Sequence, residues 1–438
     1  MAAPVAHAQT SVDIPVADAR VIATRALMAG DLELALQIAR VLLARDPDDR
    51  VALVVLAAAA PRLDDPAEGR RAGVRAWRLS ETDAQKYEAA RLTALAAAAE
   101  ERFTLATFWL RRALTVTPND AEQERTLQDA RAVTRRNPWS TNLIFSLVPS
   151  NNVNGGASED ETGSLSLSRD AQALAGVRAT LGFSTAYRLH ETRTDRSSVS
   201  LRYQLSRVAL EDAGEPRAEG SDDKIRNEDF ATDYFALSFD HMHAFENGTL
   251  GVNLSFGSFA YGLEPHYDFK RIGLSRALSL SDATTLQLSV QREIQDYEST
   301  GIRETRRTTL GTALAYRREN GDRITGSLSR LRSDSFSNNH TFEEWTLQGS
   351  YSWSQPIGPI SLSINAGLKY ADYPEYFFFG DIGREDKTFL YGANIGLPDV
   401  SYAGFSPMLQ LSGNIAESTV NRFTRDGFSM GFVLNSTF

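Results

Sequence analysis

The sequence contains no cysteine, so disulfide bridges, thiol nucleophiles and cysteine-based metal sites are all excluded. It also contains no run of about eighteen apolar residues, and a membrane-spanning helix is excluded with it. A clustered excess of lysine and arginine is missing as well, and the formal net charge is −10. Because a protein that binds nucleic acid needs such an excess to neutralise phosphates, we expect no nucleic-acid partner. Any membrane role must therefore come from strands.

The composition divides the chain of 438 residues into two parts. Up to about Arg135, alanine, leucine, arginine, aspartate and glutamate dominate, and several of these are strong helix formers. Beyond that point, serine, glycine, threonine, asparagine, phenylalanine and tyrosine take over, which are residues of strands and turns. The length exceeds that of one ordinary domain. We therefore predict a helical domain over residues 11–136 and a strand domain over residues 137–438.

The first ten residues form a separate short segment. Ala6-His7-Ala8 followed by Gln9 has the small-x-small form of a signal-peptidase site, and the residues before it resemble the end of an apolar signal segment. A basic region is missing ahead of them, so we expect the true start to lie upstream. Residues 1–10 are interpreted as the remnant of a signal peptide, and a disordered alanine-rich tail is the alternative.

Three amphipathic stretches in the helical part resemble one another, and they cover residues 30–49, 67–83 and 103–120. A small residue recurs in them at about the 34-residue period of tetratricopeptide repeats, as Ala35, Ala72 and Ala106. Small residues let paired helices approach closely, and each pair then buries its apolar face on the next pair. We predict a tetratricopeptide-like docking domain without catalytic residues, with a plain alanine-rich bundle as the alternative.

From Ser140 to the last residue, the apolar period changes from that of a helix to two. In residues 177–188 and 360–370, apolar side chains alternate with arginine, lysine and small polar side chains. Short turns such as residues 246–248 alternate with longer polar connections such as residues 212–229 and 373–385. We predict 14 strands, most of them longer than the strands of soluble sheets, near residues 140–149, 174–190, 197–210, 231–246, 249–262, 266–281, 284–298, 304–318, 321–335, 341–355, 358–373, 386–397, 404–420 and 425–438.

These strands predict a transmembrane β-barrel in the outer membrane of a Gram-negative cell, because long alternating strands with unequal connections are typical of that class. An even strand number closes the antiparallel barrel with both of its ends on one side, and closure leaves no open edge in lipid. The aromatic run of residues 376–379 is interpreted either as part of an aromatic girdle or as a hydrophobic plug.

Two sets of side chains follow from the predicted barrel. The positions expected to line the lumen include a basic set, which either pairs with acids of the wall and loops or favours anionic cargo: Arg178, Arg188, Arg202 and Lys369. The last strand alternates and ends on an aromatic residue, as in the signal that the barrel assembly machinery reads. The residues singled out for that signal are Phe428, Phe432, Leu434 and Phe438.

The junction between the two parts carries a short motif. Arg136-Asn137-Pro138-Trp139-Ser140 leads into the first strand, and Pro149-Ser150-Asn151-Asn152-Val153-Asn154 leaves it. This Pro-Trp entry and Asn-rich exit resembles the start of the barrel in the surface lipoprotein assembly modifier family. The resemblance implies periplasmic tetratricopeptide repeats joined to a 14-stranded barrel, although the repeat domain here is shorter than in well-developed members. The motif residues are Pro138, Trp139, Asn151, Asn152 and Asn154.

The resemblance also implies a function. It implies that the protein helps to deliver lipoproteins or related secreted proteins to the cell surface, and that the repeats dock a client or a periplasmic chaperone. Outer-membrane lipids and the barrel assembly machinery are the other expected partners. The residues by themselves support a second interpretation of the motif, because asparagine side chains favour turns and bond to backbone. On that interpretation Asn151, Asn152 and Asn154 shape the fold, and Trp139 is an interfacial anchor.

The barrel sequence also suggests other functions. His241-Met242-His243 presents two histidines on one face of a strand with Ser238 nearby, which would suit a nucleophile or a metal site. Neither set has a third partner in the sequence, so we interpret these as lumen-facing polar residues and predict no catalytic, cofactor or metal site. A polysaccharide exporter or a passive porin is the alternative function. An exporter would line its lumen with aromatics and acids, whereas a passive pore would need no docking domain.

Overall fold

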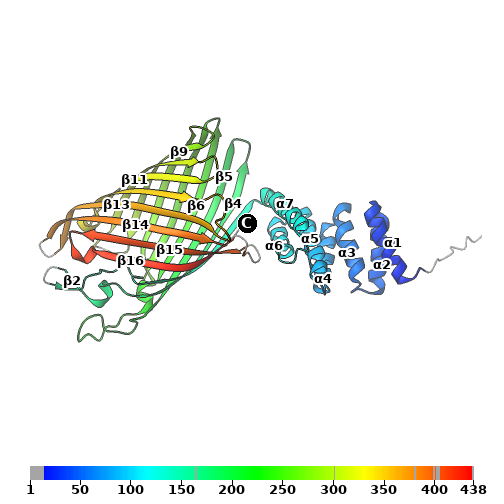
Figure 1. Ribbon diagram of the computed structural model, residues 1–438, viewed down its shortest axis with the longest axis horizontal. Helices are drawn as coiled ribbons and strands as arrows, with labels where there is room; N and C mark the ends of the chain where they lie inside the picture. Colours follow the sequence, from blue (N-terminus) through cyan, green and yellow to red (C-terminus); the bar gives the residue numbers. More distant parts are fainter. Residues whose placement is uncertain are drawn as a thin grey trace, which may run out of the picture. The chain divides into compact units, whose positions relative to one another are not determined.

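The computed structural model describes residues 14–162, 165–299, 301–378, 381–397, 400 and 405–436. Contacts divide the chain into two units that meet between Asn137 and Pro138. The described part of the first unit holds seven α-helices, and the second holds a closed barrel (Figure 1). Residues 1–10, interpreted above as a signal-peptide remnant, and Phe438 of the expected assembly signal lie outside the described residues.

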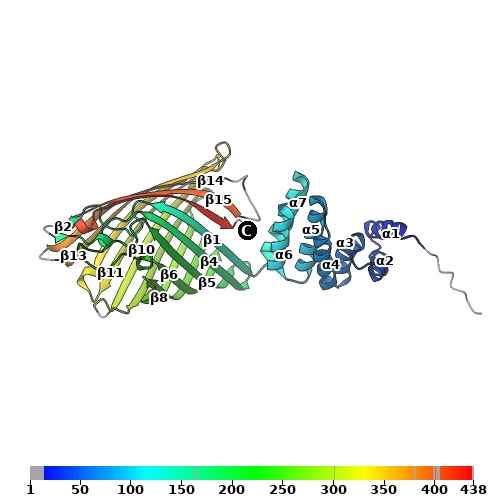
Figure 2. The same cartoon turned by 90° about the horizontal axis from the view of Figure 1, so that it is seen from below.

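The helices of the first unit pack consecutively along the chain (Figure 2). Most of them begin at an Asp, Asn or Thr whose side chain accepts a hydrogen bond from the helix's own first turn, as Asp31 and Thr82 do. No helix in the described part of the chain is long and apolar enough to cross a membrane. Their bounds are α1 (Val16–Ala29), α2 (Leu32–Arg45), α3 (Arg50–Ala59), the short 3-10 helix η1 (Ala60–Leu63), α4 (Pro66–Arg78), α5 (Asp83–Ala99), α6 (Phe103–Leu114) and α7 (Asp120–Arg136).

The helical unit is tetratricopeptide-like, as its period predicted. Ala35, Ala72 and Ala106 are all buried between helices, so the recurring small residues mark the close contacts between neighbouring helices. Ion pairs then join helices of successive pairs. Arg70 of α4 bonds Glu100 at the end of α5 at 2.5 Å, and equivalent pairs elsewhere are Arg20–Asp49, Arg40–Glu68, Arg50–Glu88 and Arg91–Asp129.

The second unit is a closed antiparallel barrel of 14 strands, as predicted, in which each strand pairs with its neighbours in the chain and β1 pairs with β16. Figure 1 shows the strands tilted against the barrel axis. The wall strands are β1 (Trp139–Ser150), β4 (Gly176–Glu191), β5 (Asp195–Leu210), β6 (Thr232–Phe245), β7 (Gly248–Tyr261), β8 (Glu264–Ser279), β9 (Thr284–Tyr297), β10 (Glu304–Arg317), β11 (Arg323–Ser335), β12 (Phe342–Ser352), β13 (Ser361–Phe378), β14 (Asp381–Gly396), β15 (Phe405–Ser418) and β16 (Arg425–Ser436).

The two faces of the wall differ as alternation requires. Large apolar side chains stand exposed on one face, and the register places them opposite one another from strand to strand, for example Leu143, Phe183 and Tyr203. We call this the outward face, because exposed leucine and phenylalanine in such numbers belong in lipid. The residues between them are small and polar and face inward. We call the end at which β1 starts the near end, and the other the far end.

The connections are less regular than the sequence suggested. The long ones at the far end are the first two, residues 151–175 and 211–231, and they contain the short strands β2 (Glu161–Thr162) and β3 (Leu165–Ser166) and the 3-10 helices η2 (Arg169–Ala171) and η3 (Asn227–Phe230). The interpretation of residues 373–385 as a long polar connection is wrong, since β13 and β14 continue to Phe378 and from Asp381. A break in register between Tyr373 and Phe377 lets the hairpin pass Pro374, which cannot donate a ladder hydrogen bond.

Candidate functional site: the barrel interior and its far mouth

The inward face lines a wide, wet interior. A barrel of about eight strands is filled by its own side chains, and a larger one leaves space. In the middle of this wall, inward-facing side chains such as Arg202, Gln287 and Ser289 are exposed to solvent. Serine, threonine, glycine, alanine and asparagine make up most of the inward positions. The interior can therefore hold water and presents little apolar surface to a passing molecule.

The basic residues predicted to line the lumen all lie at inward positions. Lys369 of β13 pairs with Glu344 of β12, at 2.6 Å between Nζ and Oε2. Arg188 pairs with Glu191 at the near end, and Arg178 donates to the carbonyl of Val153 at the far end. Arg202 has no charged partner among the described residues. Three of the four are thus held by wall or loop groups, which leaves Arg202 as a free positive charge inside the barrel.

The Asn-rich exit of β1 opens a loop, residues 151–175, that we call the Asn loop. Asn154 uses its whole amide: its nitrogen donates to the carbonyls of Asp170 and Gln172, at 3.0 and 2.7 Å, and its oxygen accepts from the backbone of Leu174 and Gly156. Asn154 in this way ties the start of the Asn loop to residues 170–174 at its end. The structure therefore gives the motif a direct part in shaping the loop.

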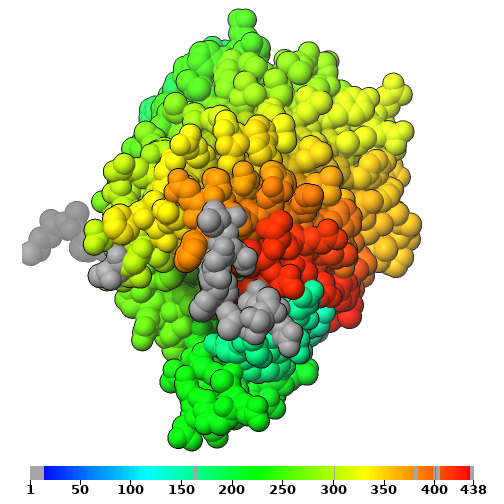
Figure 3. Space-filling model, turned by 90° about the vertical axis from the view of Figure 1, so that its left-hand side faces the viewer, coloured from blue at the N-terminus to red at the C-terminus, as the bar shows by residue number. Residues whose placement is uncertain are grey.

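The same motif also joins the first strand to the last. The oxygen of Asn151 accepts from the backbone of Phe428 at 2.7 Å, directly beyond the last ladder pair of β1 and β16, Ser150 with Ser429. The nitrogen of Asn152 donates to the carbonyl of Asp426 at 3.1 Å. The Asn loop is thus fastened to the seam at which the barrel closes. In Figure 3, which views the far end, its teal residues lie against the red residues of the last strands.

The Asn loop packs against the inner side of the far mouth. Val208 and Leu210 face inward at the far end of β5, and they form a buried cluster with Val153 and Leu174 of the Asn loop. The second far loop, residues 211–231, adds Ile225 and Phe230 to this cluster. These apolar contacts hold both loops against the inward face of β5 at the far mouth.

Ion pairs lock the two far loops together reciprocally. Arg217 of the second far loop bonds Asp170 of the Asn loop at 2.6 Å, and Arg169 of the Asn loop bonds Asp212 in return. Arg217 also bonds Asp229 of its own loop, at 2.6 Å. Sequence reasoning missed this lock because charged residues are ordinary in loops, and alternation carries no information about which loops meet.

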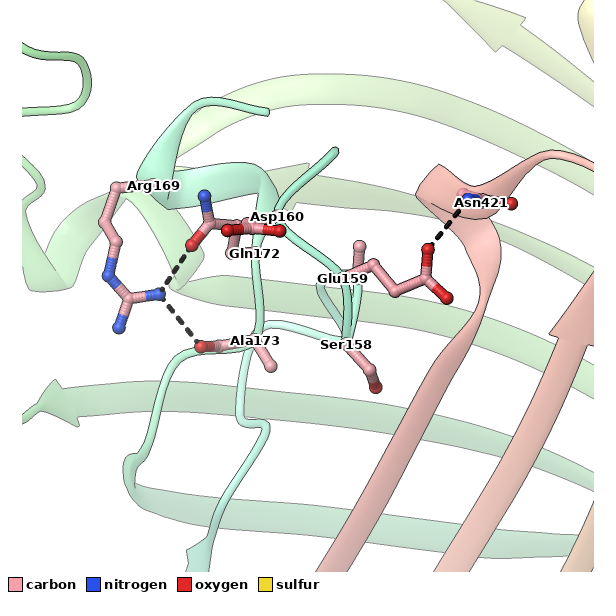
Figure 4. Close-up of a pocket in the computed structure, with 8 residues that line it drawn as sticks. Ser158, Glu159, Asp160, Arg169, Gln172, Ala173 and Asn421 are labelled. Atoms are coloured by element: carbon pink, nitrogen blue, oxygen red, sulfur yellow. Dashed lines mark hydrogen bonds between the residues drawn. The ribbon is translucent and has the colours of Figure 1, made fainter. Parts of the chain in front are cut away.

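A polar pocket of about 720 Å³ opens beside the Asn loop (Figure 4). Glu159 reaches across it to the amide of Asn421 in the short 3-10 helix η5 (Asn421–Phe423), at 2.7 Å. On its other side Arg169 donates to Gln172 and to the carbonyl of Ala173. The groups that line this pocket are therefore already bonded to one another. The pocket lies between the Asn loop and the turn that joins β15 to β16, and its lining residues do not pair a nucleophile with a base.

At the near end, the entry residues are placed as anchors. The carbonyl of Pro138 accepts from the backbone of Arg188 at 2.8 Å, which extends the pairing of β1 with β4. Trp139 is half-exposed on the outward face, and its ring contacts Tyr187 with centroids 4.7 Å apart. Of the expected assembly signal, Phe428, Phe432 and Leu434 are all exposed on the outward face of β16. A row of exposed rings at strand ends suits the boundary of a membrane.

The histidine pair does not lie in the lumen. His241 and His243 are in register with Ser197 and Asp195 on the outward face near the near end, where they bond those residues at 2.8 and 2.7 Å. Ser238 points to the opposite face and bonds Ser255 at 2.9 Å. The interpretation of the histidines as lumen-facing is therefore wrong, because strand parity separates them from Ser238. Within the described ranges, no three His, Asp or Glu residues are grouped to hold a metal ion.

The fold and its lipid-facing wall define the class: this is an outer-membrane β-barrel protein with a tetratricopeptide-like helical domain. The model of the family described as surface lipoprotein assembly modifier matches residues 223–426, which run from the second far loop into β16. The match confirms the resemblance to this family that the sequence indicated. It does not include Pro138, Trp139 or the Asn-rich exit of β1, so the motif at the junction stands apart from it. No curated protein matches the chain.

Solved structures resemble the two units separately. Acinetobacter baumannii OccAB3 is 10% identical, with a TM-score of 0.40 over 68% of this chain and 99% of that one. A bacterial polysaccharide outer membrane secretin is 9% identical, with a TM-score of 0.36 over 68% of this chain and 98% of that one. The Yersinia enterocolitica type III secretion translocator chaperone SycD is 14% identical, with a TM-score of 0.25 over 28% of this chain and 88% of that one.

Proposed function

We propose that this protein helps to deliver lipoproteins, or related secreted proteins, across the outer membrane to the cell surface. The match of the surface lipoprotein assembly modifier model to residues 223–426 is the observation that carries the proposal. In this proposal the near end faces the periplasm, so the helical domain lies there, and the far end opens at the cell surface. The barrel is inserted by the barrel assembly machinery.

The interior suits a polypeptide in transit. Its wall is wet and rich in small polar side chains, so an extended chain can slide along it without being held by apolar contacts. Some inward positive charges have carboxylate partners, such as Lys369 with Glu344 and Arg271 with Glu293. Arg202 stands exposed in the middle of the wall, where it would attract acidic segments of a passing chain.

The two far loops are placed to gate the mouth of the barrel. The Asn loop and the second far loop pack on the inward face of β5 at the far mouth, and the ion pairs Arg217–Asp170 and Arg169–Asp212 hold them to each other. Exposed or half-exposed ion pairs contribute only about 0–1 kcal/mol each. Such a lock can open for a client without unfolding the wall, whereas the amides of the Asn loop keep the loop attached to the seam.

The helical domain has a surface cluster that suits the docking of another protein. Phe108 is exposed on α6, and the guanidinium of Arg112 lies 5.5 Å from its ring and 5.0 Å from that of Trp77. An aromatic and arginine cluster on a surface is the composition of interface hot spots. We propose that this cluster contacts the client or a periplasmic chaperone.

Surface exposure of candidate lipoproteins tests the function. Intact cells with and without the gene are treated with protease, and each lipoprotein is followed by immunoblot. The proposal expects at least one lipoprotein that is cleaved only when the protein is present, and expects Phe108→Ala to reduce the cleavage while Met28→Ala, a control at an exposed position on α1, leaves it unchanged. Unchanged cleavage of every surface lipoprotein without the gene would refute the proposal.

One observation favours polysaccharide export as a second candidate function. Inward aromatic rings meet at the far ends of β7 to β9, where Phe259 and Tyr267 lie 5.3 Å apart and Tyr267 and Tyr297 lie 5.0 Å apart. Such rings can stack on sugars. Loss of exported polysaccharide from the gene-deleted cells, with lipoproteins unchanged at the surface, would favour this function over lipoprotein delivery.

A further inference from the structure

The outward wall changes from apolar to charged at a defined height near the far end. On β11, Leu328 is followed two residues later by Arg330, and the register places Arg330 beside Leu310 of β10 and Trp345 of β12. Trp345 is exposed on the same face. Because tryptophan in outer-membrane barrels collects at the level of the lipid headgroups, Arg330 lies at that level as well.

A pocket of about 280 Å³ opens outward at this height. The exposed apolar side chain of Leu310 lines it on the side of the lipid-facing belt. Three guanidinium groups and one carboxylate surround the rest. The lining residues are Arg292, Thr308, Leu310, Arg330, Arg332 and Asp334.

The three arginines are not equally neutralised. Arg330 holds Glu343 through two hydrogen bonds of 2.8 and 2.6 Å, and Arg332 bonds Asp334 at 3.0 Å. In the part of the chain that the structure describes, the polar partner of the Arg292 side chain is the hydroxyl of Thr308, and no carboxylate bonds it. Arg292 is only partly exposed, with Leu288 and Val290 below it on the same face. A positive charge beside lipid without a counter-charge is costly, so a group from outside the chain is expected to supply one.

We propose that this pocket binds the phosphate group of a lipid headgroup in the leaflet at the far end of the barrel. Guanidinium groups present paired donors that match phosphate oxygens, and three of them converge here. Leu310 would contact the acyl chains of the same lipid, and an inorganic phosphate ion cannot make that contact. The site rests on the outward face of the barrel alone, so it stands or fails independently of lipoprotein delivery.

Binding of defined lipids to the purified full-length protein tests the site. The probes are a bisphosphorylated glucosamine-disaccharide lipid, the same lipid after removal of both phosphates, and inorganic phosphate. The variant is Arg292→Gln, and the matched control is Lys387→Gln, which removes one outward cation of β14 beside Tyr370, outside the pocket. Folding of each variant is checked by its heat-dependent mobility in detergent gels. Arg292→Lys serves if the glutamine variant does not fold.

The proposal expects the phosphorylated lipid to bind the wild type, and Arg292→Gln to weaken binding by about tenfold or more, because one charge-assisted contact is lost. Lys387→Gln should leave the affinity unchanged, and Arg292→Lys should give an intermediate value, since it keeps the charge but loses the fork. Equal binding of the dephosphorylated lipid, or equal loss in Arg292→Gln and Lys387→Gln, would overturn the site. Competition by inorganic phosphate as strong as by the lipid would show an ion site instead and overturn the lipid assignment.

Discussion

Replacing Asn154 by alanine removes four hydrogen bonds at once. The amide nitrogen bonds the carbonyls of Asp170 and Gln172, and the amide oxygen bonds the backbone nitrogens of Leu174 and Gly156 at 2.9 and 3.3 Å. Leu174 is fully buried, so its backbone group would not be rehydrated without movement of the loop. We therefore expect Asn154→Ala to loosen the Asn loop while the barrel wall stays folded.

The size of the effect follows from these bonds. A typical hydrogen bond contributes about 0.5–1.5 kcal/mol net, so the loss of four costs roughly 2–6 kcal/mol of local stability. Since about 1.4 kcal/mol is a factor of ten, amide exchange limited by opening of this loop should become at least about thirty-fold faster. Asn154→Asp keeps the acceptor but loses both donors, and its effect should be smaller at Leu174 and Gly156.

Hydrogen–deuterium exchange of the full-length protein in detergent measures this directly. The amide of Leu174 should exchange faster in Asn154→Ala, and that of Gly156 should change less, because it keeps its 2.9 Å hydrogen bond to Asn152 Oδ1. Amides in the middle of β10 should not change. Asn414→Ala is the control, because that side chain faces inward on β15 and forms no side-chain hydrogen bond among the described residues. Unchanged exchange at Leu174 in Asn154→Ala would refute the structural part assigned to the motif.

Three further predictions concern other parts of the molecule. At Gly431 in β16 an added Cβ would lie 2.4 Å from the carbonyl oxygen of Leu147, so Gly431→Ala should lower the folded fraction in heat-mobility gels, whereas Gly349→Ala, with nothing within 4 Å, should not. A hydrogen bond from Tyr351 is the main cause that lowers the pKa of Asp322, in a near-end turn, to about 2. The stability that the ionised Asp322 carboxylate gives to the fold is complete above the unfolded pKa of about 4 and is lost as pH falls through 2. The NMR chemical shift of the Asp322 carboxyl carbon should therefore titrate near pH 2 in the wild type, and closer to pH 4 in Tyr351→Phe. Arg70→Ala leaves a half-buried carboxylate unpaired and should cost about 1–3 kcal/mol, read as a lower melting temperature of the helical circular-dichroism signal; an unchanged melting temperature would contradict this.

The strands were predictable because lipid enforces alternation over their whole length. The predicted β10, near residues 304–318, is observed as Glu304–Arg317, and its last residues differ only where the turn begins. The hairpin of β13 and β14 was underestimated because Pro374 and the run of aromatic residues after it interrupt the period of two. Tyr376 is buried against Phe423 and Phe377 is exposed, so these two residues together fit neither a girdle nor a plug. Phe379, the last residue of the run, lies outside the described residues.

The site was predictable only in part, because its geometry comes from contacts between distant segments. The Asn residues at the exit of β1 could be singled out from the sequence, because an asparagine side chain can form up to four hydrogen bonds and so favours a structural role in a turn. Their partners at Asp426 and Phe428 lie more than two hundred residues away, and no local pattern pointed to them. Strand parity predicted Arg202 on the inward face, but the same parity, miscounted against Ser238, placed His241 there wrongly.

Photo-crosslinking from inside the barrel tests most directly whether a client passes through it. A photoreactive amino acid is placed at Arg202, which faces the lumen, or at Leu201, its neighbour on the outward face, in cells that produce a candidate lipoprotein. Adducts with the lipoprotein are expected from position 202 and not from position 201. Adducts from neither position, or from both equally, while the lipoprotein still reaches the surface, would contradict passage through the lumen.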